Sequence, residues 1–144
     1  MNATQTSVKS PAAGDWLRIG LMATVVAVIA VLAVQLLATR LWPEIALFRP
    51  LDSYARSAAF VIAPAIAATG LFAWLARRSP QADTQFLRIA VVVLLLSFIP
   101  DYILPVEHKT LLASSVAAFL HVVAGVILVA MLTSGYRRLT GAGH

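Results

Sequence analysis

The sequence predicts an all-α integral membrane protein whose four transmembrane helices form an antiparallel up-down-up-down bundle. Three observations predict this fold: the composition, four long uncharged stretches, and the distribution of basic residues between them. Of the 144 residues, 60% are hydrophobic and 12% are charged, and the mean hydropathy is +0.88. Soluble domains carry about 25% charged residues. The composition is therefore typical of a membrane protein.

Four uncharged stretches divide the chain, at residues 19–39, 57–76, 89–100 and 110–136. A helix needs about 20 apolar residues to cross a hydrocarbon core of about 30 Å. Three of the stretches have that length, but the third has only twelve residues. We therefore expect the third span to run from Phe86 to Pro105 and to include Pro100 and Asp101.

The domain organisation follows from these stretches. We expect one membrane domain at residues 15–138, with spans at about 17–40, 54–76, 86–105 and 110–134. Residues 1–14 are expected to form a flexible cytoplasmic tail and residues 139–144 a short one. The first apolar run is longer than the core of a signal peptide, about 7–15 residues, and lacks a cleavage pattern, so we expect it to be retained. Short connections between spans favour antiparallel neighbours.

The basic residues predict the orientation. Seven Lys and Arg lie on the side of the termini and four on the opposite side. Because basic residues are enriched on the cytoplasmic side, both termini are expected in the cytoplasm. Aromatic side chains that sit at headgroup level should mark the ends of spans. Those expected at inner ends are Trp16, Trp74 and Tyr136, and those at outer ends are Trp42, Tyr54 and Tyr102.

Several classes of function find no support in the sequence. The chain has no Cys, which excludes disulfides, thiolate metal sites and Cys nucleophiles. The net charge of +5 comes from basic residues scattered between apolar stretches, so we expect the lipid bilayer rather than nucleic acid as the partner. No phosphate loop, dinucleotide motif or catalytic set of side chains is recognisable. We therefore predict no enzymatic activity, no cofactor and no metal site.

Small and polar residues predict which helix faces meet, because small residues and shared hydrogen bonds mark helix contacts in lipid. In the second span, Ala59, Ala63, Ala67 and Gly70 predict a packing face. On each of the other three spans, polar residues and the small or apolar residues between them form a set with spacings of four, three and four residues. Residues at these spacings share one side of a helix. These sets are Thr24, Val28, Val31 and Gln35; Ala90, Leu94, Ser97 and Asp101; and Ser114, Ala118, His121 and Gly125.

The third and fourth spans together predict a polar pocket inside the bundle, formed by Ser97, Asp101, Ser114 and His121. With a rise of about 1.5 Å per residue, Asp101 is expected at the level of Ser114, and His121 near the bilayer centre at the level of Leu94. Asp101 and His121 are then roughly 10 Å apart along the axis. We expect no direct hydrogen bond between them, so Ser97, Ser114 or water would have to connect them.

Two prolines lie inside predicted helices. Pro64 and Pro100 each remove a backbone donor, which frees the carbonyls of Phe60 and Leu96. We expect a kink at each proline and a free acceptor for a neighbouring helix. Weakened helices beside a histidine are compatible with a small cavity.

The ionisable residues allow two interpretations each. His121 could carry a proton or bind a ligand, as expected of an ionisable group deep in a membrane, or it could be a neutral imidazole bonded to Ser97 or to a freed carbonyl. Asp101 could serve the same pocket, or it could reach headgroup water or pair with Arg56 or Lys109.

Two further polar groups have simpler interpretations. Gln35 is expected to form a hydrogen bond between helices rather than to contact a ligand. Glu107 and His108, with Asp101 nearby, could in principle hold a divalent ion. Adjacent residues on a turn rarely converge on one ion, however, so we predict no metal site there.

Two short motifs resemble a domain-of-unknown-function family of small bacterial membrane proteins. They are Ser-Phe-Ile-Pro-Asp at residues 97–101, which is similar to a motif in the family's third span, and His-Val-Val-Ala at residues 121–124, which is similar to one in its fourth span. The resemblance is best over residues 86–133 and weak over the first two spans. It implies a four-span chain and singles out Ser97, Pro100, Asp101 and His121. It brings no established activity, substrate or cofactor.

Taken together, these observations predict a small multi-pass protein of the bacterial inner (cytoplasmic) membrane. One hypothesis is that its polar pocket takes a proton, water or a small ligand. The other is that the chain is a structural or regulatory subunit, which docks with a membrane-protein partner, or with a copy of itself, through the alanine-rich second span.

Overall fold

The computed structural model describes residues 11–141 and contains four long α-helices. They are α1 (Ala13–Leu41), α2 (Tyr54–Arg78), α3 (Ala82–Ile103) and α4 (Leu111–Thr140), with a short 3-10 helix, η1 (Pro43–Leu47), after α1. Each long helix has the length and hydropathy needed to cross a membrane. Within residues 11–141 no residue lies in a strand. The prediction of an all-helical chain with four apolar helices is therefore confirmed.

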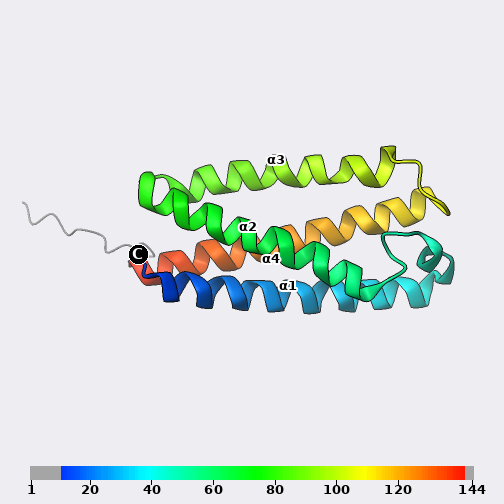
Figure 1. Cartoon of the computed structure of the whole chain (residues 1–144), viewed down its shortest axis with the longest axis horizontal. Helices are drawn as coiled ribbons and strands as arrows, with labels where there is room; N and C mark the ends of the chain where they lie inside the picture. The colour runs from blue at the N-terminus through cyan, green and yellow to red at the C-terminus, as the bar shows by residue number, and fades with distance from the viewer. Residues whose placement is uncertain (1–10, 142–144) are drawn as a thin grey trace, which may run out of the picture.

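The four helices lie side by side, and consecutive helices run in opposite directions (Figure 1). α1 packs against α2 and α4, and α3 packs against the same two helices from the other side. The start of α1, the end of α4 and the α2–α3 connection share one end of the bundle, which we call the termini end. η1 and the α3–α4 connection lie at the opposite end, the loop end.

Side-chain caps fix where the helices begin. The Asp15 carboxylate accepts a hydrogen bond from the Ala12 backbone N–H (3.0 Å) at the start of α1. The Ser53 hydroxyl accepts from the third residue of α2 (3.3 Å), and the Thr110 hydroxyl from the third residue of α4 (3.0 Å). These bonds satisfy N–H groups that have no partner inside the helix. α4 ends before Gly141, whose φ of +69° is the left-handed conformation that commonly stops a helix.

The third helix differs in position from the predicted span at 86–105. It begins at Ala82, because a helix can start among polar residues; Asp83 in the first turn complements the helix dipole. It ends at Ile103, because Pro105 holds Leu104 in an extended conformation. The other helices also extend past the predicted spans, so the predicted tail at 1–14 overlaps α1. Residues 1–10 and 142–144 of the predicted tails lie outside the described residues.

An aromatic cluster at the termini end takes one residue from each helix. Phe72 of α2 stacks on Phe86 of α3 with ring centroids 4.5 Å apart. It meets Trp16 of α1 edge-on at 5.4 Å and Tyr136 of α4 at 5.2 Å. Trp16 is 5% exposed, so its ring faces the inside of the bundle. The ring is buried because it stacks on Tyr136.

The buried face of α2 is not the predicted one. Ala59, Ala63, Ala67 and Gly70 are all exposed. The residues that α2 buries are Ser57, Val61, Ala65, Phe72 and Leu75. α3 lies close to α2 at the termini end and diverges from it toward the loop end (Figure 1), so the alanine stripe stays exposed within the described chain.

The third helix is attached mainly at its ends. Its buried residues are Ala82 and Phe86 near the termini end and Asp101 near the loop end. At the termini end, Arg137 of α4 forms an ion pair with Asp83 of α3 at 2.7 Å. Between Phe86 and Asp101 the helix buries no residue, which leaves space beside its middle turns.

Two glycines permit the closest helix contacts. A Cβ atom on Gly20 of α1 would lie 2.6 Å from the Thr69 side chain of α2, and one on Gly135 of α4 would lie 2.8 Å from Ile19 of α1. The Thr69 hydroxyl donates to the Ala65 carbonyl at 2.8 Å, which fixes its rotamer. Sequence reasoning singled out Gly70 instead, where a Cβ would meet nothing within 4 Å.

We predict that Gly20→Ala destabilises the chain, because the new methyl group would overlap the fixed Thr69 side chain. The expected loss in the free energy of unfolding is about 1–3 kcal/mol. Gly70→Ala is the matched control and should stabilise by about 0.5–1 kcal/mol, because Ala favours a helix and meets no neighbour there. Unfolding in SDS, followed by circular dichroism, measures both. Equal effects of the two substitutions would contradict the packing described here.

Candidate binding cleft

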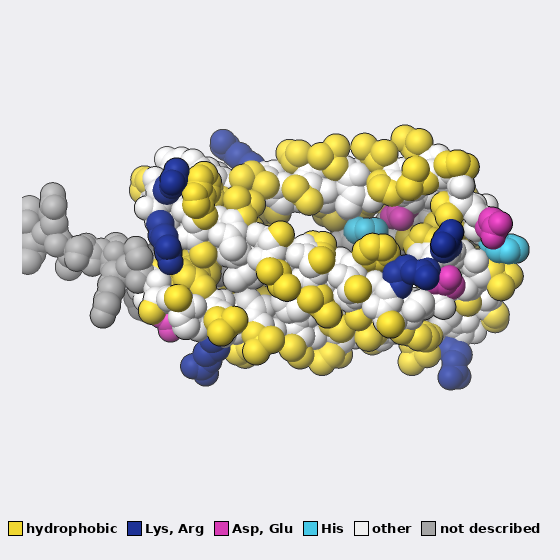
Figure 2. Space-filling view, viewed as in Figure 1, with side chains coloured by type: hydrophobic (Ala, Val, Ile, Leu, Met, Phe, Trp, Pro, Cys, Tyr) yellow, Lys and Arg dark blue, Asp and Glu magenta, His cyan; other side chains and the backbone are white. Residues whose placement is uncertain are grey.

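A cleft of about 890 Å³ lies between α2, α3 and α4. α2 contributes residues from Arg56 to Leu71, α3 from Phe86 to Asp101, and α4 from His121 to Val129. Figure 2 shows its opening as a hollow between α2 and α3, with a histidine and an acidic side chain visible inside. The cleft therefore opens on the side of the bundle, along the length of the helices.

The polar groups of the cleft gather toward the loop end. Of its 24 lining residues, the five with polar side chains are Arg49, Arg56, Ser97, Asp101 and His121. The wall toward the termini end is apolar and includes Leu71, Phe86 and Leu128. The cleft thus has a polar part and a long apolar part.

Asp101 and His121 meet directly in this cleft. His121 Nδ1 lies 3.4 Å from Asp101 Oδ2, within the range of an ion pair when the imidazole is protonated. The Asp101 side chain is 7% exposed and the His121 side chain 40%. The two side chains therefore approach each other without the serine or water that the predicted axial separation of roughly 10 Å required. As expected, they form no direct hydrogen bond within residues 11–141.

The expected need for a bridge comes from treating residues as points on a helix axis. Side chains of an α-helix lean toward its N-terminus. α3 and α4 are antiparallel, so Asp101 leans toward the termini end and His121 toward the loop end. His121 Nδ1 reaches the Ala117 carbonyl, one turn earlier, at 2.9 Å. The two side chains therefore approach each other across levels that their backbones do not share.

The contacts of His121 assign its tautomer. The Ala117 carbonyl can only accept a hydrogen bond, so Nδ1 carries the hydrogen and donates it. This bond replaces the expected one to Ser97 or to a proline-freed carbonyl. Nε2 is then the nitrogen that accepts a hydrogen bond or a proton. Asp101 Oδ2 is buried and has no hydrogen bond within residues 11–141.

The two serines of the predicted pocket have structural contacts. Ser114 Oγ donates to the Asp101 backbone carbonyl at 2.7 Å, so these residues do lie at one level. Ser114 is buried and does not line the cleft. Ser97 lines the cleft but donates its hydroxyl to the Leu94 carbonyl of its own helix at 2.7 Å. Both prolines also line the cleft, and α2 and α3 continue through them.

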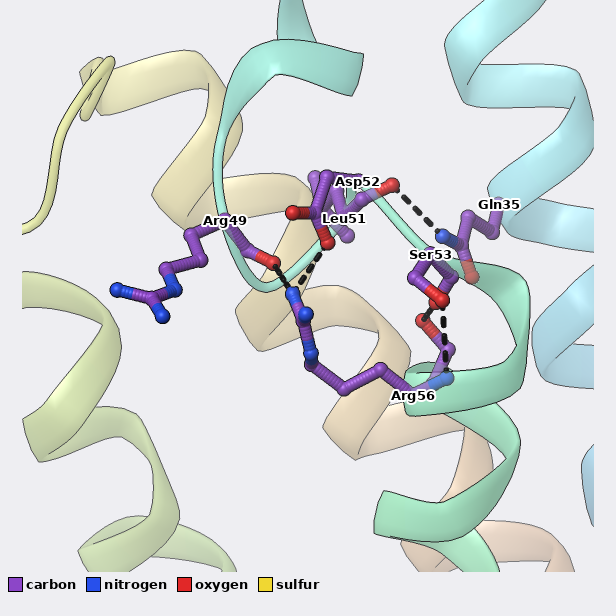
Figure 3. A network of polar contacts seen from close by, with 7 residues as sticks. Gln35, Arg49, Leu51, Asp52, Ser53 and Arg56 are labelled. Carbon is purple, nitrogen blue, oxygen red and sulfur yellow. Dashed lines mark hydrogen bonds and ion pairs between the residues drawn. The ribbon is translucent and has the colours of Figure 1, made fainter.

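The predicted pairs of Asp101 with Arg56 or Lys109 are wrong. Arg56 Nη1 donates to the Asp52 carboxylate and to the Arg49 carbonyl (Figure 3). The Lys109 ammonium donates to the Tyr102 and Leu104 carbonyls at 3.1 and 3.0 Å, at the end of α3. Both cations satisfy nearby groups at the loop end, which leaves His121 as the charge partner of Asp101.

Gln35 binds the α1–α2 connection to the inside of the bundle at the loop end. It is fully buried, and its Nε2 donates to the Leu51 carbonyl at 3.0 Å (Figure 3). The expected bond between helices is instead a bond from a helix to the α1–α2 connection. Ile45 and Phe48 of this connection are also buried. The segment after α1 is thus folded against the bundle, and it places Arg49 at the cleft.

Arg49 is the functional candidate that sequence reasoning missed. Its guanidinium has no hydrogen bond or ion pair among the described residues, and its side chain extends away from Asp52 toward α3 (Figure 3). The sequence offered one signal: Arg49 is one of only four basic residues on its side of the predicted topology.

A metal site finds no support in this part of the chain. Among residues 11–141, no three His, Asp or Glu side chains lie close enough together to hold an ion. His108 lies in the α3–α4 connection with a φ of +55°. Asp101 points instead toward His121.

We predict that Asp101 and His121 are energetically coupled. His121→Leu removes the partner of a buried carboxylate and should lower the free energy of unfolding by about 1–3 kcal/mol. Adding Asp101→Leu should restore most of this loss, because no unpaired charge then remains. A double-mutant cycle of SDS unfolding measures the coupling. Additive effects of the two substitutions would contradict a direct interaction.

Comparison with known proteins assigns a family and no activity. No curated protein and no solved structure matches the chain. The model of DUF6069, a family of unknown function, matches residues 11–138. The match covers α1, α2 and α3 and all but the last two residues of α4. The chain belongs to DUF6069, a family of unknown function.

Proposed function

We propose that this chain is a multi-pass membrane protein that binds a small ligand in the cleft between α2, α3 and α4. The observation that carries the proposal is the cleft itself, with the Asp101 and His121 pair in its wall. Its volume of about 890 Å³ lies within the range of ligand pockets, about 300–1,000 Å³. Such pockets are mostly apolar and have a few polar groups that orient the ligand.

The ionisable pair supports this proposal over an inert bundle. Charged side chains inside a membrane are costly, so they usually serve a function. Nε2 of His121 is not used by the Ala117 bond and remains for an occupant of the cleft. The proposed role is binding, with no chemical step.

We further propose that the protein lies in the bacterial inner membrane with both termini in the cytoplasm. The support is the excess of basic residues near the termini, seven against four. Both described ends of the chain lie at the termini end of the bundle. A membrane crossed by all four helices would therefore place the two ends on the same side.

We predict that Ala67→Phe removes a bound ligand, because Ala67 lines the cleft and a phenyl ring would fill it. Ala63→Phe is the matched control, since Ala63 is an exposed residue of α2 outside the cleft. Native mass spectrometry of the purified full chain should detect a bound species with wild type and Ala63→Phe and lose it with Ala67→Phe. Retention of the species by Ala67→Phe would refute the proposal.

A second candidate function is supported by the exposed alanine stripe of α2. Ala59, Ala63 and Gly70 have no cover within the described chain. Small residues allow close approach of helices in lipid. The chain could thus be a structural or regulatory subunit that docks with a membrane-protein partner, or with a second copy, through this stripe.

Cysteine crosslinking tests the second candidate, because the chain has no Cys of its own. If α2 docks, Ala63→Cys should form a crosslinked product in membranes. Val126→Cys, an exposed residue of α4, should not. Equal crosslinking at both positions would argue against a specific docking face.

A further inference from the structure

We propose that the cleft binds a membrane lipid with an anionic headgroup, with an acyl chain in the apolar part and the headgroup phosphate at Arg49. This inference rests on the proposed function and names its ligand class. It uses two observations that the ligand proposal does not need: the length of the apolar part, and the position of a cation that has no partner among the described residues.

The apolar part has the length of one lipid leaflet. Along α2 it extends from Phe60 to Leu71, which is about 16 Å at a rise of about 1.5 Å per residue. Half of a hydrocarbon core of about 30 Å is about 15 Å. An acyl chain whose headgroup lies at the loop end would therefore reach Phe86 and Leu71, where the cleft ends against the aromatic cluster.

The cleft opens toward the region that lipid acyl chains would occupy in a bilayer. The hollow faces the side of the bundle between α2 and α3 (Figure 2), and the helices beside it expose large apolar residues such as Phe60 and Val93. A lipid could enter sideways without leaving the bilayer.

The charge at the mouth of the cleft selects the headgroup. Arg49 lines the loop end of the cleft and has no ion-pair partner among the described residues. Arg56 donates to the Arg49 carbonyl while Asp52 neutralises its charge. Arg56 is therefore a positioning residue, and Arg49 is the one of these two cations that has no partner within residues 11–141. A guanidinium binds phosphate oxygens through paired N–H donors.

The acidic residue in the cleft does not oppose this assignment. Asp101 Oδ2 is buried and faces His121 Nδ1. This carboxylate oxygen therefore faces the imidazole rather than the mouth of the cleft. Arg49 is therefore the charged side chain that faces the headgroup position.

Lipid titration of the delipidated full chain in a non-ionic detergent, followed by native mass spectrometry, tests the proposal. The probes are phosphatidylglycerol, which is anionic, and phosphatidylcholine, which is zwitterionic. Wild type should prefer phosphatidylglycerol. Arg49→Gln should weaken its binding about fivefold, the effect expected for one basic residue near a lipid surface, and should abolish the preference.

The matched control is Arg40→Gln. Arg40 is an exposed residue in the last turn of α1, also at the loop end, and it does not line the cleft. This substitution removes the same charge and should leave the preference unchanged. Equal affinities of wild type for the two lipids, or equal effects of Arg49→Gln and Arg40→Gln, would overturn the headgroup assignment.

Ala67→Phe separates this inference from the proposed function. If it removes binding of both lipids while wild type shows no headgroup preference, the cleft still binds a ligand and only the anionic assignment fails. If it leaves binding of lipid and of any copurified species unchanged, both proposals fail. A stable dimer whose formation is blocked by Ala67→Phe and not by Ala63→Phe would show that a second copy occupies the cleft, and would also overturn the lipid assignment.

Discussion

The stack of Phe86 on Phe72, with centroids 4.5 Å apart, determines where α3 joins the bundle. Phe72 is fully buried and also contacts Trp16 and Tyr136, so one ring joins all four helices. Aromatic contacts of this kind contribute about 0.5–1.5 kcal/mol each beyond the area they bury. Because the rings occupy only the termini end, they fix the start of α3 and leave its middle turns free to diverge from α2.

The space beside α3 can persist because, in lipid, the hydrophobic effect does not drive the helices together. In water, an apolar gap of this size would favour collapse of the helices. In a bilayer, acyl chains cover the same side chains as well as another helix does, so packing and polar contacts decide which helices touch. α3 has such contacts with α4 through Asp101 and Ser114, and few with the middle of α2. The cleft follows from this unequal attachment.

The four helices could be predicted from the sequence because the number of spans depends only on the length and hydropathy of the uncharged stretches. The sequence could also predict that Asp101 and Ser114 lie at one level, because a short turn joins α3 and α4. It could not predict the contact of Asp101 with His121, which depends on the lean of side chains in antiparallel helices. Axial arithmetic ignores that lean.

Two other features had no reliable signal in the sequence. The alanine stripe of α2 has the pattern of a packing face, but which face packs depends on where α3 diverges. Arg49 lies in a connection without periodicity, and its position depends on the bond from Gln35 to the Leu51 carbonyl. Both outcomes are set by tertiary contacts between segments that lie apart in the sequence.

Because the cleft opens on the side of the bundle, its occupancy depends on the concentration of the ligand in the membrane rather than in water. A molecule that enters from the bilayer is governed by its mole fraction among the surrounding lipids, and its arrival rate by diffusion in two dimensions. Even a weak site would then be filled if its ligand were an abundant membrane component. A scarce apolar molecule would first be concentrated by partitioning into the membrane. Occupancy would thus change with membrane composition while the aqueous phase stayed constant.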